Sequence, residues 1–253
     1  MEDVTLIIQG KLYQDSYDFY IKNYTEFPVI ISTWSDCIID FSNIPNNFIV
    51  ILAPLPLESG KQNINYQLVS TLNALKRVTT PLVIKIRGDE YYSNIESIYN
   101  QIKMEQDKIH TAPIFFRAWQ FAEYHISDHI IAGTKERVML MFKESKKNFD
   151  TGEMNISKWK LEGKFHRWIT TEAPEERITK SYLNSIDPFR YDIIDGVILM
   201  KEHFDILDIT KLFPYKIKAN IWEAEWDNKE FIPEENYSIS NMYQLGSDTP
   251  YIK

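Results

Sequence analysis

The sequence has a single cysteine, Cys37, so no disulfide can form within the chain. Disulfides belong to oxidising compartments, whereas reducing compartments keep thiols free. The sequence also has no run near the roughly 20 consecutive apolar residues that a membrane-spanning helix needs. Its first ten residues, MEDVTLIIQG, are acidic and not typical of a signal peptide. We therefore expect a cytoplasmic protein without a transmembrane segment.

Positive charge is also in short supply. The 28 Lys and Arg residues are outnumbered by 36 Asp and Glu, which gives a net charge of -8 and a pI near 5.2. This balance argues against a nucleic-acid-binding surface, which is usually basic. In such an acidic protein, an anionic ligand would have to be bound by a few local cationic side chains, by backbone amides at the start of a helix or by a metal ion.

The residues that are present favour one large α/β domain. The chain has 253 residues, of which 44% are hydrophobic and 25% charged. Apolar runs rich in branched residues predict strands at 4–10, 27–34, 47–56 and 82–87. Such near-continuous runs are typical of a sheet covered on both faces. A helix is predicted between the last two runs, over 63–78, because Ile64, Leu68, Leu72 and Leu75 recur at helical spacing behind a possible N-cap, Asn63. The order strand, helix, strand along the chain indicates a parallel sheet.

The later part of the chain has weaker patterns. Further helices are predicted at 94–107, 135–145 and 173–183, and strands at 112–119, 124–134 and 192–200. The stretch 145–170 is polar and without a clear period, so we expect a loop there. We expect one domain over 1–214, with a C-terminal extension, 215–253, that packs on it.

Polar residues follow three of the predicted strands. In open α/β sheets the ligand crevice lies beyond the carboxyl ends of the strands. Those positions hold Gln9 and Gly10, then Asp36, then Arg87 and Asp89. We expect all five at one edge of the sheet, where they would bind a ligand.

Arg87 and Asp89 are the most informative of these residues. A carboxylate after a strand suits Mg²⁺ or Mn²⁺, which prefer oxygen ligands and share them with substrate phosphates. Arg87 would point to the same side as Asp89 and pair with it or with a diphosphate. The alternative is a solvated ion pair at a strand end, which contributes little.

Several segments, in this order, resemble the WavE lipopolysaccharide synthesis family. They are VTLIIQGKL, FPVIISTWSD, NINYQLVSTLNALKRVTTPLVIKIRGDE, HISDHIIAGTKE and APEERITKSYL, and the resemblance covers roughly residues 4 to 185. It implies a glycosyltransferase of GT-A type, with a Rossmann-like, mostly parallel mixed sheet and helices on both faces. Such an enzyme binds a sugar nucleotide and usually a divalent cation, Mn²⁺ or Mg²⁺.

The resemblance also implies roles for single residues. The cation is commonly held by an Asp-x-Asp motif at the end of the fourth strand, and here Asp89 keeps the last Asp whereas Arg87 replaces the first. Arg87 could meet the phosphates directly. By the same resemblance Asp36 would lie near the base or ribose, and Asn65 and Gln67 near the nucleotide.

A base is needed if the transfer inverts the sugar configuration, because the acceptor hydroxyl must lose its proton. Glu175 is our candidate, since it opens a predicted helix beside the expected loop. Acidic residues also favour first helical turns for electrostatic reasons alone. Asp128, followed by Gly133, is the second candidate for the base or for an acceptor-sugar ligand, or else it is a capping carboxylate.

The predicted function is that of a hexosyl- or related sugar transferase, which moves a sugar from a UDP- or GDP-sugar to a glycan or other hydroxyl acceptor. A catalytically inactive nucleotide-sugar-binding or assembly module is the alternative. A nucleotidyltransferase is less favoured, because such enzymes usually carry a glycine-rich basic loop after the first strand. The stretch IIQGKLYQD has one glycine and one lysine there, and the chain has only 8 glycines.

Overall fold

The computed structural model describes residues 1–113, 124–151, 173–187, 193–212 and 215–216. These contain a seven-stranded sheet in the order β3-β2-β1-β4-β7-β6-β8. Its strands are β1 (Val4–Gln9), β2 (Val29–Trp34), β3 (Phe48–Ala53), β4 (Leu82–Arg87), β6 (Ile109–Thr111), β7 (Ile130–Thr134) and β8 (Phe204–Ile206). The four strands predicted in the first half of the chain are confirmed, each slightly shorter than expected.

The sheet is mixed and mostly parallel. β1, β2, β3 and β4 are parallel neighbours, β7 is antiparallel to both β4 and β6, and β6 is parallel to β8. The register places Gln9, at the end of β1, level with Arg87 at the end of β4 and with Ser32 in β2. Two of the predicted ligand positions are therefore side by side at the carboxyl edge of the sheet.

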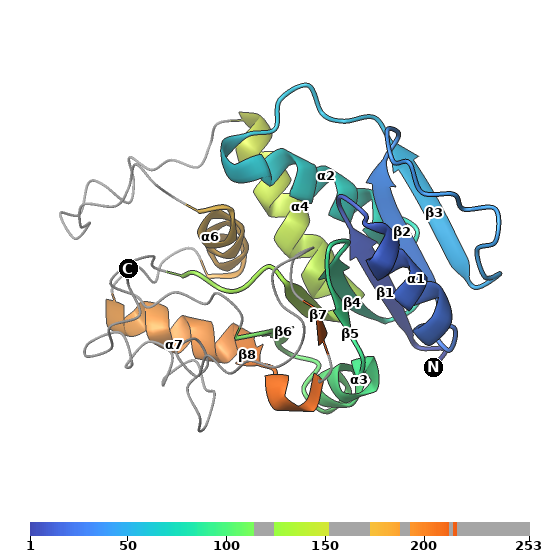
Figure 1. The fold of residues 1–253 in the computed structure, drawn as a ribbon. Coiled ribbons are helices and arrows are strands. Elements are labelled where there is room, and N and C mark those ends of the chain that lie inside the picture. Colours follow the sequence, from blue (N-terminus) through green and yellow to red (C-terminus); the bar gives the residue numbers. More distant parts are fainter. Residues whose placement is uncertain (114–123, 152–172, 188–192, 213–214, 217–253) are drawn as a thin grey trace, which may run out of the picture.

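Helices cover both faces of this sheet (Figure 1). On one face α1 (Gln14–Asn23) and α3 (Ile95–Met104) pack against the strands, in a hydrophobic core that includes Tyr20 and Ile98. On the other face α2 (Ile64–Leu75), α4 (Lys135–Thr151) and α6 (Pro174–Ile186) form a second core, with Leu68, Phe142 and Ile178. The predicted α/β class, with helices on both faces of a mostly parallel mixed sheet, is confirmed.

The alternation of side chains along β4 points two cations toward one face. Ile84 and Ile86 belong to the core with α1 and α3, whereas Val83 belongs to the core with α2 and α4. Because successive side chains of a strand alternate between faces, Lys85 and Arg87 lie on the same face as Val83. The strand thus carries two positive charges under α2 at its carboxyl end.

The predicted strand over 192–200 is wrong. The chain forms helix α7 (Ile193–His203), and a short strand, β8 (Phe204–Ile206), follows it. A short apolar run fits a buried strand and a buried helix equally well by pattern alone. Burial does not separate the two structures, since Leu199 and Met200 are adjacent and both buried, as neighbouring residues also are in a strand covered on both faces.

Other element boundaries also differ from the predictions. The strand expected over 124–134 begins only at Ile130, and the helix predicted to end at 145 continues to Thr151. Thus 145–151 are not loop, and 152–170 lie outside the described residues. Similarly, the strand expected over 112–119 has its counterpart in β6 (Ile109–Thr111), and most of 112–119 is not described.

The start of α2 also departs from the simple cap predicted there. Asn63 is the N-cap residue, but its side chain makes no capping hydrogen bond. Its backbone and that of Gln62 are left-handed, with φ of 64° and 51°. The turn Lys61–Asn63 (η1) therefore sets the entry to α2 through backbone geometry.

The end of the described chain returns to the middle of the molecule. Strand β9 (Tyr215–Lys216) pairs antiparallel with β5 (Tyr91–Tyr92), which follows β4, and the short turn η3 (Ile209–Leu212) precedes it. The predicted extension 215–253 lies, beyond these two residues, outside the described part, so the domain boundary stays a prediction. Of the helices that are described, none is long and apolar enough to cross a membrane.

Candidate functional site

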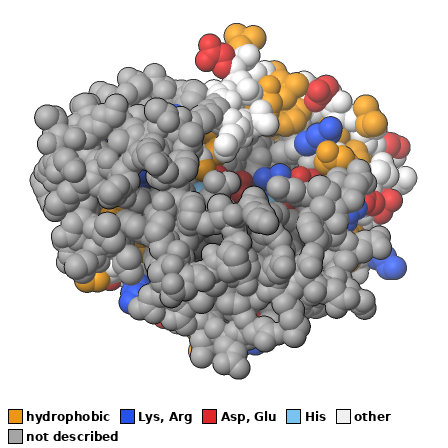
Figure 2. Space-filling view, turned by 60° about the vertical axis from the view of Figure 1, so that its left-hand side comes forward, with side chains coloured by type: hydrophobic (Ala, Val, Ile, Leu, Met, Phe, Trp, Pro, Cys, Tyr) orange, Lys and Arg blue, Asp and Glu red, His pale blue; other side chains and the backbone are white. Residues whose placement is uncertain are grey.

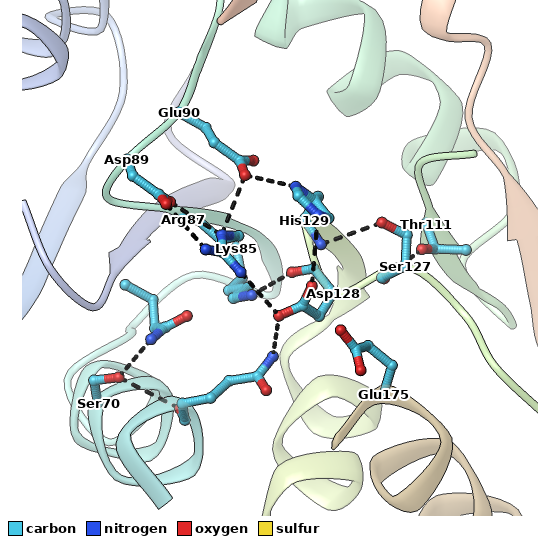
Figure 3. A network of polar contacts seen from close by, with 12 residues as sticks. Ser70, Lys85, Arg87, Asp89, Glu90, Thr111, Ser127, Asp128, His129 and Glu175 are labelled. Carbon is cyan, nitrogen blue, oxygen red and sulfur yellow. Dashed lines mark hydrogen bonds and ion pairs between the residues drawn. The ribbon is translucent and has the colours of Figure 1, made fainter. Parts of the chain in front are cut away.

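A network of charged side chains surrounds Arg87 at the carboxyl end of β4 (Figure 3). Its guanidinium donates to both oxygens of Asp89, from Nε at 3.0 Å and from Nη2 at 2.9 Å. It also lies 3.1 Å from Glu90 Oε1 and 3.6 Å from Asp128 Oδ2. Burial alone would lower the pKa of Arg87, but these carboxylates outweigh burial and raise it above its usual value. Arg87 is therefore a permanent cation held by three carboxylates.

The Arg87–Asp89 pair is partly buried and forms part of a larger network of charged side chains. The side chain of Arg87 is 29% exposed and that of Asp89 18%, whereas Glu90 is 0% exposed. The network thus runs from a buried end at Glu90 to an end that solvent reaches at Arg87 and Asp89. In Figure 2, basic and acidic side chains lie next to one another in a recess beside hydrophobic side chains.

Glu90 is the functional candidate that sequence reasoning missed. Its Oε1 lies 2.5 Å from His129 Nδ1, and its Oε2 accepts a hydrogen bond of 2.8 Å from the Tyr92 hydroxyl. Burial and the adjacent Glu90 raise the pKa of Tyr92, so this hydroxyl stays protonated and donates. Nothing in the sequence Gly88, Asp89, Glu90 after β4 indicates that the Glu90 side chain turns inward while that of Asp89 stays partly exposed.

Asp128 joins the network from the segment before β7. Its Oδ2 accepts from Gln67 Nε2 at 2.8 Å, and its backbone carbonyl accepts from Lys85 Nζ. Burial would raise the pKa of Asp128, but Lys85 and Arg87, with contributions from His129 and His125, hold it well below the usual aspartate value. A carboxylate that holds its charge so firmly is a poor base, so the contacts of Asp128 suit positioning better than proton transfer.

Lys85 lies beneath this network. It is fully buried, and that burial lowers the pKa of its ammonium group, although the charge of Asp128 acts in the opposite direction. Its ammonium group donates a hydrogen bond to the Asp128 carbonyl. Lys85 therefore supports the segment before β7 from inside the protein.

Helix α2 links the network to β1. Gln67 reaches Asp128, and one helical turn later Ser70 accepts a hydrogen bond of 2.8 Å from Gln9 Nε2. Gln67, Gln9, Arg87, Asp89 and Asp128, all predicted as site residues, therefore belong to one connected region. Their place in a ligand site stays a prediction, because the structure contains no ligand.

Glu175 approaches the same region from α6. It stands in the first turn of the helix, as predicted, directly after Pro174. Its Oε2 lies 3.7 Å from His125 Nε2, and its side chain is 23% exposed. Figure 3 shows its carboxylate on the side of the network where Asp128 and Ser127 lie. A partly exposed carboxylate beside an imidazole has the chemistry of a base candidate.

The remaining predicted residues lie apart from the network. Asp36 is exposed in the turn after β2. Asn65 donates to the Glu58 carbonyl at 2.9 Å, and its buried Oδ1 has no hydrogen-bond partner within the described residues. Gly10 has a φ of 94° and donates its amide to Ser32 O. They border the same edge of the sheet, and within the described residues none of the three forms a hydrogen bond or ion pair with Arg87.

The described residues do not fit a divalent cation at Asp89. Both Asp89 oxygens already accept from Arg87. In the described ranges, no three His, Cys, Asp or Glu side chains are grouped so that they could hold a metal ion. The cation expected from the sequence stays a prediction.

A family model described as WavE lipopolysaccharide synthesis matches residues 24–186, which is more than half of the chain. The chain belongs to the WavE lipopolysaccharide synthesis family. The resemblance seen in the sequence is thereby confirmed, although the match begins at residue 24 and so leaves out β1. Arg87, Glu90, Asp128 and Glu175 all lie inside the WavE match.

Solved structures give only distant similarities to this WavE chain. HddC from Yersinia pseudotuberculosis, complexed with GMP-PN, is 15% identical over 55% of this chain and 79% of its own, with a TM-score of 0.36. The apo-form glycosyltransferase GlyE of Streptococcus pneumoniae TIGR4 is 10% identical over 83% of this chain, with a TM-score of 0.40. The alignment covers 46% of GlyE, so it spans less than half of that protein. No curated protein sequence matches the WavE chain significantly.

Gly88 holds the turn between Arg87 and Asp89, and we expect Gly88→Ala to destabilise the WavE chain by roughly 1–3 kcal/mol. A Cβ at this position would lie 2.6 Å from the backbone oxygen of Lys11, so one of two backbone segments must move. Urea denaturation would measure the loss. Ser35→Ala, in an exposed turn after β2, is the control and should change stability by less than about 0.5 kcal/mol. Equal free energies of unfolding for the two variants would show that the turn at Gly88 accommodates a Cβ without loss of stability.

Proposed function

We propose that this WavE-family chain is a glycosyltransferase that moves a sugar from a UDP- or GDP-sugar to a hydroxyl group of a glycan acceptor. The observation that carries the proposal is the solvent-reached guanidinium of Arg87 at the carboxyl edge of the sheet, held from behind by Glu90 and Asp128. A fixed cation at this edge suits a leaving diphosphate, because preorganised charge stabilises the anion that develops as the sugar leaves. The family's description, lipopolysaccharide synthesis, is consistent with sugar transfer.

The proposed chemistry is a single inverting displacement. Glu175 takes the proton of the acceptor hydroxyl, and that oxygen attacks the anomeric carbon of the donor sugar. The bond between the anomeric carbon and the diphosphate oxygen breaks, and its electron pair leaves with the nucleoside diphosphate. Arg87 meets the charge that builds up on the diphosphate. Asp128 serves to hold Arg87 and Gln67 in place.

The nucleotide is proposed to lie between the ends of β1 and β2 and the start of α2. Gln9, Gly10 and Asn65 border this region, and Asp36 lies at its exposed rim. The buried Oδ1 of Asn65, which has no hydrogen-bond partner among the described residues, is a free acceptor for a ligand N–H or O–H. We assign the base and ribose to this side and the diphosphate to Arg87.

The test is a thermal-shift screen of the full chain with UDP, GDP, CDP and the corresponding sugar nucleotides. A ligand that binds the native state at a hundredfold excess over its Kd stabilises it by about 2.7 kcal/mol, or roughly 5–10 °C for a chain of this size. We expect such a shift with nucleotides of one base. No shift with any of them would contradict the proposal.

Product analysis then separates the enzyme classes. With the sugar nucleotide that binds, a glycosyltransferase releases the nucleoside diphosphate when an acceptor is present. An inactive binding module releases nothing, and a nucleotidyltransferase instead forms pyrophosphate from a nucleoside triphosphate and a sugar phosphate. We expect release of the nucleoside diphosphate only.

A further inference from the structure

We propose that Asp89 is a counter-ion of Arg87, and that the donor diphosphate binds to the Arg87 guanidinium without a divalent cation at Asp89. The inference rests on the proposed function and deepens it, because it specifies how the donor's charge is met. It assigns to Asp89 a role other than the cation ligand expected from the sequence.

Arg87 contacts both oxygens of Asp89. Arg87 Nε and Nη2 approach different oxygens, at 3.0 and 2.9 Å, as a two-pronged pair. Two parallel hydrogen bonds of this kind are among the stronger contacts between side chains. The pair is two residues apart across Gly88, whose turn lies against Lys11. A cation bound to Asp89 would have to displace the guanidinium and would then face its positive charge at close range.

The other carboxylates beside Arg87 are also engaged. Glu90 Oε1 contacts both Arg87 and His129, and Asp128 Oδ2 accepts from Gln67 as well as lying near Arg87. These contacts hold the guanidinium from its buried side. An arriving diphosphate therefore does not need Asp89 to keep Arg87 in place.

Exposure shows which part of the network a ligand reaches. Arg87 and Asp89 are 29% and 18% exposed at their side chains, whereas Glu90 and Asp128 are 0% and 8% exposed. An anion that approaches Arg87 thus meets the negative charge of Asp89 beside it. In this arrangement Asp89 opposes anion binding, whereas as a cation ligand it would be required for it.

The two roles predict opposite effects of Asp89→Asn on the affinity for a nucleoside diphosphate. If Asp89 is a counter-ion, its neutralisation removes repulsion and frees part of the guanidinium, so a nucleoside diphosphate binds roughly three- to tenfold tighter in EDTA. If Asp89 holds a cation, the same variant loses binding. The amide keeps the size of the side chain, so the comparison isolates charge.

The experiment is calorimetric titration of UDP, GDP and CDP into the full chain, once with EDTA and once with MnCl₂. We expect the wild-type protein to bind one nucleotide with a Kd that differs by less than about twofold between the two conditions. Asp89→Asn should tighten binding, and Arg87→Gln should weaken it at least about tenfold in EDTA. Asp107→Asn, the same charge change at an exposed turn after α3, is the matched control and should leave Kd unchanged.

Each outcome decides something different. Binding only with Mn²⁺, together with its loss in Asp89→Asn, would overturn the inference while the proposed function stands. Absence of nucleotide binding in every condition would overturn the proposed function itself. Thermal unfolding of each variant without ligand shows whether it is folded. If Arg87→Gln does not fold, Arg87→Lys is used in its place.

Discussion

Glu175→Gln is expected to lower kcat of sugar transfer by about 10²- to 10⁴-fold, because an amide cannot take the proton of the acceptor hydroxyl. Glutamine keeps the shape of the side chain in the first turn of α6, so the KM for the donor should change little. A loss in kcat alone is what removal of a base produces, since the base acts only in the transition state. Initial rates with the nucleotide sugar identified by binding would measure it.

The neighbouring residue provides the control. Glu176 stands in the same turn, but its Oε1 lies 2.5 Å from Lys180 Nζ one turn later, and its side chain is only 12% exposed. Glu176→Gln should therefore keep kcat near the wild-type value, at some expense in stability. Equal rates for Glu175→Gln and the wild type would remove Glu175 from the chemistry and leave His125 and Asp128 as the groups to test next.

Glu90→Ala should have the largest effect on stability, a loss of roughly 3–5 kcal/mol in the free energy of unfolding. The carboxylate is completely buried, and its removal takes partners from Arg87, His129 and Tyr92 together. Removing a buried carboxylate leaves part of the charge and hydrogen-bonding capacity of its partners uncompensated in the interior, which costs more than the contacts themselves contribute. Urea denaturation followed by circular dichroism would measure the loss.

Asp89→Ala is the matched comparison. It removes a carboxylate from the same guanidinium, one residue earlier in the chain, but at the end of the network that solvent reaches. The loss should stay below about 1.5 kcal/mol, because water can replace the missing acceptor. If the two variants lose equal stability, the difference in burial between these neighbouring carboxylates has no energetic consequence.

Much of the sheet could be predicted from local pattern. Branched apolar runs give β1, β2 and β4, whose side chains are covered on both faces, and also the edge strand β3, where Ile49 and Leu52 are half exposed. The helical spacing of Leu68, Leu72 and Leu75 likewise gave α2. The edge at which Gln9 and Arg87 meet followed from strand direction alone.

The hydrophobic pattern of the sequence failed as a guide where it fits two different structures. The apolar run at 192–200 fits a strand or a helix, and the choice of α7 depends on which neighbours cover it. The sequence pattern also does not distinguish the two adjacent carboxylates, Asp89 and Glu90. The turn at Gly88 and the contact with the ring of His129 leave Asp89 partly exposed and Glu90 buried.

The sequence by itself determined the α/β class, the strands that reach the carboxyl edge and the cation and carboxylates at the end of β4, because alternation and charge are local properties of a chain. The tertiary structure alone decided which of these groups touch. Glu90 meets His129 across 39 residues, and Gln67 meets Asp128 across 61. Contacts at such separations depend on how α2, β4 and the segment before β7 pack together, whereas the pairing of Arg87 with Asp89, two residues apart, was already predicted from the alternation of side chains along a strand.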